Sequence, residues 1–192
     1  MAVDTRTALL DAAQELAQER GLNAFSFSDL ASRLNIKKAS IHYHFPSKAD
    51  LAREIVVRYR ERFDQELSSI SSRHRGPKRR LSAFITLFQR TLSQGSRICL
   101  CGMLASEFTT LPDKVQREVQ VFFENTERWL IEVLSDGQRR GAFAFSGSVT
   151  DIARNLLAML EGAMITSRTF SDERRFRAAG KWIVASIENR AH

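Results

Sequence analysis

The sequence predicts an all-α fold of about nine helices, and three observations support this prediction. The 192 residues include only three prolines and nine glycines, the residue types that most often interrupt helices. Apolar residues recur every three or four positions along long segments of the chain. Residues that suit helix starts and helix ends stand between these segments.

The first two helices are predicted from their ends. A helix over about residues 4–20 ends at Gly21, which suits a helix C-terminus. Ser26 and Asp29 have the spacing of a capping box, so a second helix starts at the next residue after Ser26. Asn35 accepts the left-handed conformation that ends a helix, and we therefore expect a tight turn there.

A third, short helix follows this turn. It begins near Lys37 or Lys38 and is stopped by Pro46. Ser47 and Asp50 then form the next capping box. Six more helices are expected, over about residues 48–72, 78–93, 99–110 and 112–140 and from openings at Ser148 and Ser171.

Residues 26–50 thus predict a helix-turn-helix, the unit that lays its second helix in the DNA major groove. Lys37, Lys38 and Lys48 stand at helix N-termini, where the helix dipole disfavours each cation by about 0.3–1 kcal/mol. Phosphate oxygens or base edges would meet both these lysines and the free N–H groups. The alternative is that they are ordinary solvated lysines.

The run Tyr43-His44-Phe45-Pro46-Ser47-Lys48 is the most specific part of a longer pattern. With it, the span from about Thr5 to Tyr59 resembles the DNA-binding domain of TetR-family transcriptional regulators. The other matching residues are Leu9, Ala12, Ala13, Gly21, Ser26, Asp29, Leu30, Ala31, Ile36, Lys38, Ser40, Ile41 and Leu51.

The chain departs from the family's commonest pattern at three positions of the third helix. Lys37, Ala39 and His42 stand where a small hydroxyl residue, Gly and Tyr are frequent. These positions bear on which operator is read. Carried over from the family, Lys37, Lys38 and Ser40 are expected at base edges, His42 and Tyr43 at the backbone or in mixed contacts, and Ser26 and Lys48 at phosphates.

The resemblance implies two domains, a helix-turn-helix DNA-binding domain over residues 1–48 and a helical effector-binding and dimerisation domain over 49–192. It implies that the last two long helices pair with their copies in a homodimer. Small residues at Ala153, Ala158, Gly162 and Ala163 permit close helix approach, although packing within one chain is the alternative. Two recognition helices spaced about 34–36 Å apart would read a palindromic double-stranded DNA operator.

A pocket for a small, largely apolar effector is expected among the fifth to eighth helices. For each residue taken alone, ordinary core packing is the competing interpretation. A carboxylate at Glu107 would meet a cationic or hydroxylated ligand, or would point to water. The candidate effector residues are Phe84, Phe88, Met103, Glu107, Phe108, Phe122, Trp129 and Met159.

Cys99 and Cys101 give an alternative function, an electrophile or redox sensor on the same scaffold. That function needs an accessible thiolate, and Arg97 nearby would lower the pKa of a thiol. The competing interpretation is two small buried apolar residues. Two cysteines form no disulfide framework, which fits a reducing cytoplasm.

Composition and motifs limit the remaining classes. The net charge of +7 favours a polyanionic partner. There is no apolar run near 18 residues and no N-terminal secretion signal, so we expect a cytoplasmic protein without a membrane partner. We find no nucleophile elbow, phosphate loop, dinucleotide fingerprint or metal-spaced set, and therefore expect no enzyme, cofactor or metal site. The regulator is expected to be a repressor released by its effector; the sequence leaves an activator open.

Overall fold

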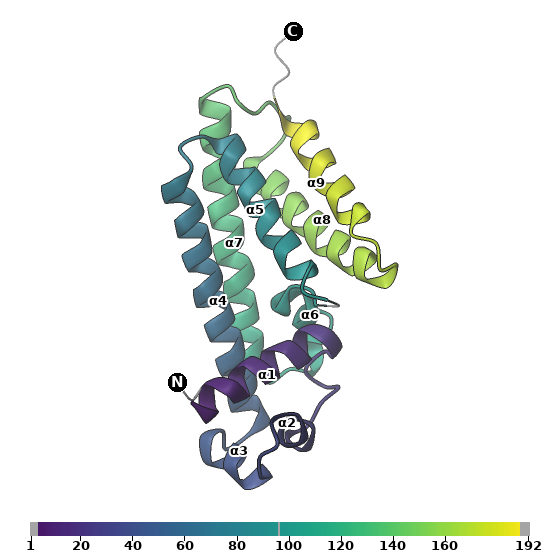
Figure 1. Ribbon diagram of the computed structural model, residues 1–192. Coiled ribbons are helices and arrows are strands. Elements are labelled where there is room, and N and C mark those ends of the chain that lie inside the picture. The colour runs from purple at the N-terminus through teal and green to yellow at the C-terminus, as the bar shows by residue number, and fades with distance from the viewer. Residues whose placement is uncertain (1–3, 96, 189–192) are drawn as a thin grey trace. The chain divides into compact units, whose positions relative to one another are not determined.

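The computed structural model describes residues 4–95 and 97–188. Over these residues the chain forms nine α-helices and one short 3-10 helix, which confirms the all-α prediction (Figure 1). The helices are α1 (Thr5–Arg20), α2 (Phe27–Leu34), α3 (Lys38–His44), α4 (Lys48–Arg73), α5 (Pro77–Leu92), α6 (Leu100–Ala105), η1 (Phe108–Thr110), α7 (Asp113–Arg139), α8 (Val149–Thr169) and α9 (Arg174–Ile187).

Local capping determines the ends of the first helices as the sequence predicted. Gly21 follows α1 with a φ of 92°, and its N–H donates to the Ala17 carbonyl. Ser26 and Asp29 form the expected capping box at the start of α2. Asn35 adopts the left-handed conformation, with a φ of 52°. The turn between α2 and α3 is therefore set by residues within it.

Helix α6 is shorter than the predicted range of about 99–110. Its end is a tight turn, in which the Ser106 N–H donates to the Met103 carbonyl at 3.3 Å and the Glu107 N–H donates to the Leu104 carbonyl at 3.0 Å. Such bonds between residues three apart tighten the last turn of a helix. The chain then continues as the 3-10 helix η1.

Helix α9 begins later than the predicted opening at Ser171. Ser171 has a φ of 50°, so it lies in the left-handed region and does not start a right-handed helix. One Asp172 carboxylate oxygen accepts the Arg174 N–H at 3.0 Å. By accepting this bond the carboxylate satisfies an N–H group of the first turn, and α9 starts at Arg174.

The described residues pack as two compact units. The first unit contains residues 4–62 and 100–122, and the second contains residues 63–99 and 123–188. Helices α4 and α7 each contribute residues to both units. This division describes packing; the functional boundary between residues 48 and 49 stays a prediction.

The first unit has an apolar core under the helix-turn-helix. Helix α1 packs against α2 and α6, and α2 packs against α3. Leu9, Leu30 and Ile41 are fully buried in this unit. Burying a side chain of this size stabilises a fold by about 1.5–3 kcal/mol, so these contacts hold α3 in place.

The core of the second unit is built on α5, α8 and α9. Helix α8 packs against α9, and both contact α5. Phe84, Leu160 and Phe176 are fully buried, one from each of these helices. None of the helices in the described ranges combines the length and the apolarity needed to cross a membrane.

Candidate nucleic-acid interface

Helix α3 has one packed face and one exposed face. Ile41 is fully buried and Phe45, four residues later, is 1% exposed. Tyr43 lies between them and is 85% exposed. Lys37 and Lys38, at the start of the helix, are also exposed, and no side chain caps this end. The α3 N-terminus thus presents cations next to backbone N–H groups that no side chain satisfies.

Ser26, a predicted phosphate contact, is the N-cap of α2. Its hydroxyl oxygen accepts the Asp29 N–H at 3.3 Å, and its own N–H donates to the Asp29 carboxylate at 2.7 Å. The hydrogen bonds from the Ser26 hydroxyl and N–H hold the pKa of Asp29 below its usual value. Ser26 remains exposed, so the cap leaves room for a phosphate.

The remaining predicted DNA contacts lie on or beside α3. His42 is exposed, and its ring meets the Phe27 ring edge-on with the centroids 5.0 Å apart. Ser40 is half-buried in the first turn. Arg33, a neighbouring cation, is paired with Glu15 of α1 at 2.6 Å. All these residues belong to the first unit, and their DNA contacts stay predictions.

Lys48, the other predicted phosphate contact, is also tied to the protein. Its Nζ donates to the Phe25 carbonyl and lies 4.7 Å from the centroid of the Phe25 ring. Burial lowers the pKa of Lys48, while the charges of Glu107 and Asp29 oppose this change. A lysine ammonium has three donors, so the bond to Phe25 leaves capacity for a phosphate.

The eight predicted effector residues do not fall in one unit. Trp129 and Phe84 stack in the second unit with ring centroids 5.3 Å apart, and Phe84 meets Phe88 at 5.1 Å. These rings form part of the core, as the competing interpretation held. The second unit contains Phe84, Phe88, Trp129 and Met159, and the first contains Met103, Glu107, Phe108 and Phe122.

Glu107 contacts the segment that immediately precedes the helix-turn-helix. One carboxylate oxygen accepts the Leu22 N–H at 2.7 Å, and the other accepts the Asn23 N–H at 3.3 Å. The carboxylate thus binds backbone donors between α1 and α2. A contact between Glu107 and an effector stays an untested prediction.

Glu161 of α8 is a buried carboxyl that the sequence reasoning missed. It is 9% exposed, and neither carboxyl oxygen has an N–H or O–H partner among the described residues. Burial raises its pKa to about 7, opposed by a hydrogen bond with the Cys99 thiol. Its burial could have been predicted from the spacing, because Glu161 lies four residues after Leu157 and three before Met164, on the apolar face of α8.

Both cysteines are buried. Cys99 is 1% exposed, and Cys101 is fully buried. Their thiols are free of disulfides. Electrophile sensing needs an accessible thiolate. The burial of both side chains therefore favours the interpretation of two small apolar residues over the sensor.

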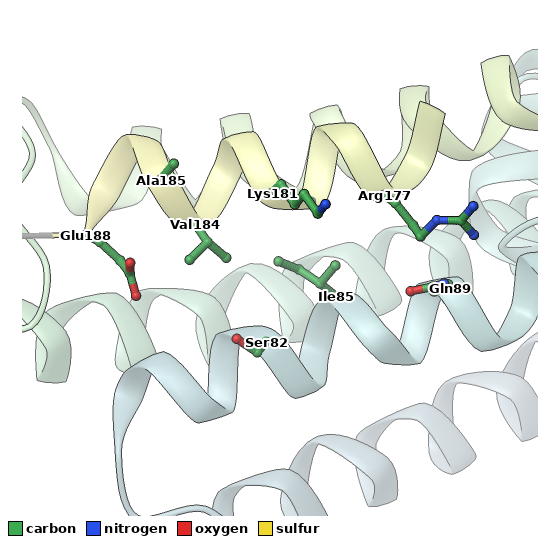
Figure 2. A pocket seen from close by; sticks show the side chains of 9 residues that line it. Ser82, Ile85, Gln89, Arg177, Lys181, Val184, Ala185 and Glu188 are labelled. Carbon is green, nitrogen blue, oxygen red and sulfur yellow. The ribbon is translucent and has the colours of Figure 1, made fainter. Parts of the chain in front are cut away.

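An open groove of about 420 Å³ runs between α5 and α9 in the second unit. Figure 2 shows Ile85 and Val184 between the two helices, with Arg177 and Gln89 toward one end and Glu188 toward the other. Its lining contains none of the eight predicted effector residues.

The capped α2, the left-handed turn and the exposed face of α3 define a helix-turn-helix DNA-binding protein. Residues 9–55 match the family described as bacterial regulatory proteins, tetR family. Residues 77–183 match the tetracyclin repressor-like C-terminal domain. The two matches cover more than half of the chain, which therefore belongs to the TetR family.

Relatives and solved structures agree with this assignment. The HTH-type transcriptional repressor BepR of Brucella suis biovar 1 (strain 1330) is 28% identical over 175 residues, covering 84% of this chain and 79% of BepR. A TetR regulator from Legionella pneumophila has a solved structure with 32% identity and a TM-score of 0.89, covering 97% of this chain and 99% of that one. A TetR-family regulator from Agrobacterium tumefaciens has 30% identity and a TM-score of 0.93, covering 96% and 97%. The protein is a DNA-binding transcriptional regulator and not an enzyme.

Proposed function

We propose that this regulator is a repressor that binds a palindromic operator as a homodimer and leaves it when a small molecule binds. The observation that carries the DNA-binding part is the exposed face of α3, where Lys37, Lys38 and Tyr43 project from a helix held by buried Ile41. The repressor role of the relative BepR supports the direction of regulation. This function would place the protein in the cytoplasm, with the chromosome.

The homodimer is supported by an exposed face on α8 and α9. In α8 this face carries Ala158, Gly162 and Ile165, and in α9 it carries Trp182, which is 58% exposed. A side chain added at Gly162 would meet nothing within 4 Å in this chain. A mid-helix glycine costs about 1 kcal/mol relative to alanine, and the close approach of a partner helix at Gly162 would offset that cost.

The effector part is supported by Glu161. Burying a carboxyl that has no N–H or O–H partner is unfavourable, and a ligand that brings such a donor would relieve that cost. An amine, amide or hydroxyl group on a largely apolar molecule has this chemistry. We therefore place the proposed effector contact at Glu161 in the second unit, rather than at Glu107.

The experiment that tests the proposal starts from a random pool of duplex DNA. The purified protein should enrich a palindrome, protect both half-sites in a footprint and bind as two chains per site. Reporter transcription from a promoter carrying that palindrome should fall when the protein is present. Enrichment of no sequence would overturn the DNA-binding proposal, and increased transcription would make the protein an activator.

The thiol sensor is a second candidate that the geometry supports less well. Electrophiles react with an accessible thiolate, whereas the Cys99 and Cys101 side chains are both buried. A ligand-binding regulator is therefore the better supported of the two.

A further inference from the structure

Glu107, which lies outside the helix-turn-helix in sequence, holds the turn between α1 and α2. Its two carboxylate oxygens accept the Leu22 N–H at 2.7 Å and the Asn23 N–H at 3.3 Å. These donors precede Ser26, the N-cap of α2. Bonds to a charged acceptor are stronger than neutral ones, so the carboxylate holds this backbone segment firmly.

The turn has a shape that admits the carboxylate. Gly21 has a φ of 92°, a conformation that side chains rarely adopt. A Cβ at this position would lie 2.5 Å from a Glu107 carboxylate oxygen, closer than Cβ atoms approach other atoms in real proteins. Gly21 therefore provides both the turn conformation and the space that Glu107 occupies.

A second contact fixes the same two segments. The Asn23 side-chain amide donates to the Thr110 hydroxyl at 2.8 Å, and that hydroxyl donates to the Glu107 carbonyl at 2.8 Å. Glu107 and Thr110 thus hold the turn from one side, through backbone and side-chain donors. The contact joins residues more than 80 positions apart in the sequence.

The turn leads directly into the DNA-reading helices. Phe25 follows it, is 4% exposed, and accepts a hydrogen bond from Lys48 through its carbonyl. The Glu107 charge also acts on Lys48, whose pKa it raises against the effect of burial. A shift of the turn would therefore move the start of α2 and the Lys48 ammonium together.

We propose that Glu107 is a positioning residue for operator binding. It fixes the α1–α2 turn, and thereby the orientation in which α2 lies against the DNA backbone and α3 enters the major groove. This inference rests on the proposed operator binding and adds a residue that touches no DNA. Its carboxylate acts through Leu22 and Asn23. Loss of the carboxylate should therefore lower the ratio of operator affinity to random-DNA affinity.

The test compares Glu107→Ala and Glu107→Gln with Glu124→Gln, an exposed change on α7. The operator is the duplex that the unaltered protein selects from a random pool. Fluorescence anisotropy gives affinities for that duplex and for a random duplex of the same length. Hydrogen exchange reports the Leu22 and Asn23 amides, and thermal unfolding and sedimentation report folding and dimerisation.

Glu107→Ala should weaken operator binding by about ten-fold, as expected when bonds to a charged acceptor are lost. Affinity for random DNA should fall less than affinity for the operator, because removing a negative charge favours binding to any duplex. The Leu22 and Asn23 amides should exchange faster. Glu107→Gln should have an operator affinity between those of Glu107→Ala and the unaltered protein, since its amide oxygen can accept only part of these hydrogen bonds. Glu124→Gln should have the affinity of the unaltered protein.

A merely structural role would lower the unfolding temperature but leave the operator-to-random ratio of the folded dimer unchanged, and that result overturns the proposal. An equal loss on both duplexes also overturns it. If Glu107→Ala does not fold, the ratio of operator affinity to random-DNA affinity can be measured on Glu107→Gln and Asn23→Ala instead. Failure of the unaltered protein to select any duplex would refute the proposed function instead.

Discussion

In the second unit the Cys99 thiol lies beside the Glu161 carboxyl, and burial raises the pKa of that carboxyl to about 7. Cys99 is also the residue immediately before Leu100, where α6 begins. The chain thus runs from the neighbour of Glu161 through a six-residue helix toward Glu107.

Glu161 should make the stability of the protein depend on pH. Its folded-state pKa is raised, so the folded state holds this proton more tightly than the unfolded state does. Its contribution is complete below about pH 4.5 and is lost as the pH rises to about 7, a change of about 3 kcal/mol. The free energy of unfolding, measured in urea at pH 5 and at pH 8, tests this expected loss of stability.

Glu161→Gln should remove the pH dependence of stability that Glu161 causes. At pH 8 the variant should therefore unfold at a higher urea concentration than the unaltered protein. The exposed Glu132→Gln on α7 is the matched control and should keep the original pH profile. If Glu161→Gln and Glu132→Gln show identical profiles, Glu161 does not titrate as a buried group.

Lys48→Ala should weaken binding about equally on all duplexes. If its ammonium meets one phosphate, the slope of log affinity against log salt should fall by about 1. Salt titrations with operator and random duplexes measure this slope. Lys181→Ala removes one positive charge from an exposed position of α9 and should leave the salt slope unchanged. An unchanged slope for Lys48→Ala would reduce its role to holding the Phe25 carbonyl.

Lys38→Ala and Ser40→Ala should change specificity instead. Both residues lie in the first turn of α3, where side chains reach base edges. Loss of a good base contact costs about 1–3 kcal/mol on the operator and less on random DNA. Competition between the two duplexes measures the ratio. A ratio equal to that of the unaltered protein would show that these side chains do not read bases.

Gly162→Leu should weaken the proposed homodimer. A large side chain on the exposed face of α8 would separate two closely packed helices, and overpacking costs about 1–3 kcal/mol. The dimer dissociation constant, from sedimentation, should rise by about ten-fold or more. Gln138→Leu, at an exposed position of α7, is the control. Dimerisation equal to that of the control would place the interface elsewhere.

Replacement of both cysteines by serine should leave operator affinity and its response to peroxide unchanged, because both thiols are buried. The measurement is anisotropy of the operator complex before and after peroxide or a reactive aldehyde. Release from the unaltered protein, together with resistance of the double variant, would establish the thiol sensor.

The order of the helices and the ends of the first helices could be predicted from the sequence alone. The start of α2 depends on Ser26 and Asp29, three residues apart, and its end depends on the conformation of Asn35. Such signals are local, so they need no knowledge of distant contacts. The helix-turn-helix and the exposed lysines of α3 could be predicted for the same reason, whereas α9 started three residues late because Ser171 is left-handed.

Only the tertiary structure decided which polar side chains face one another. Glu107 was expected to meet a ligand or to point to water, and the structure adds a contact that neither interpretation included: its carboxylate accepts the N–H of Leu22, 85 residues earlier in the chain. The sequence around Glu161 predicted no role for it, because the burial of its carboxyl depends on the segments that pack around α8. Helix capping is short-ranged along the chain, while the partners and burial of a carboxylate follow from segments that folding brings together.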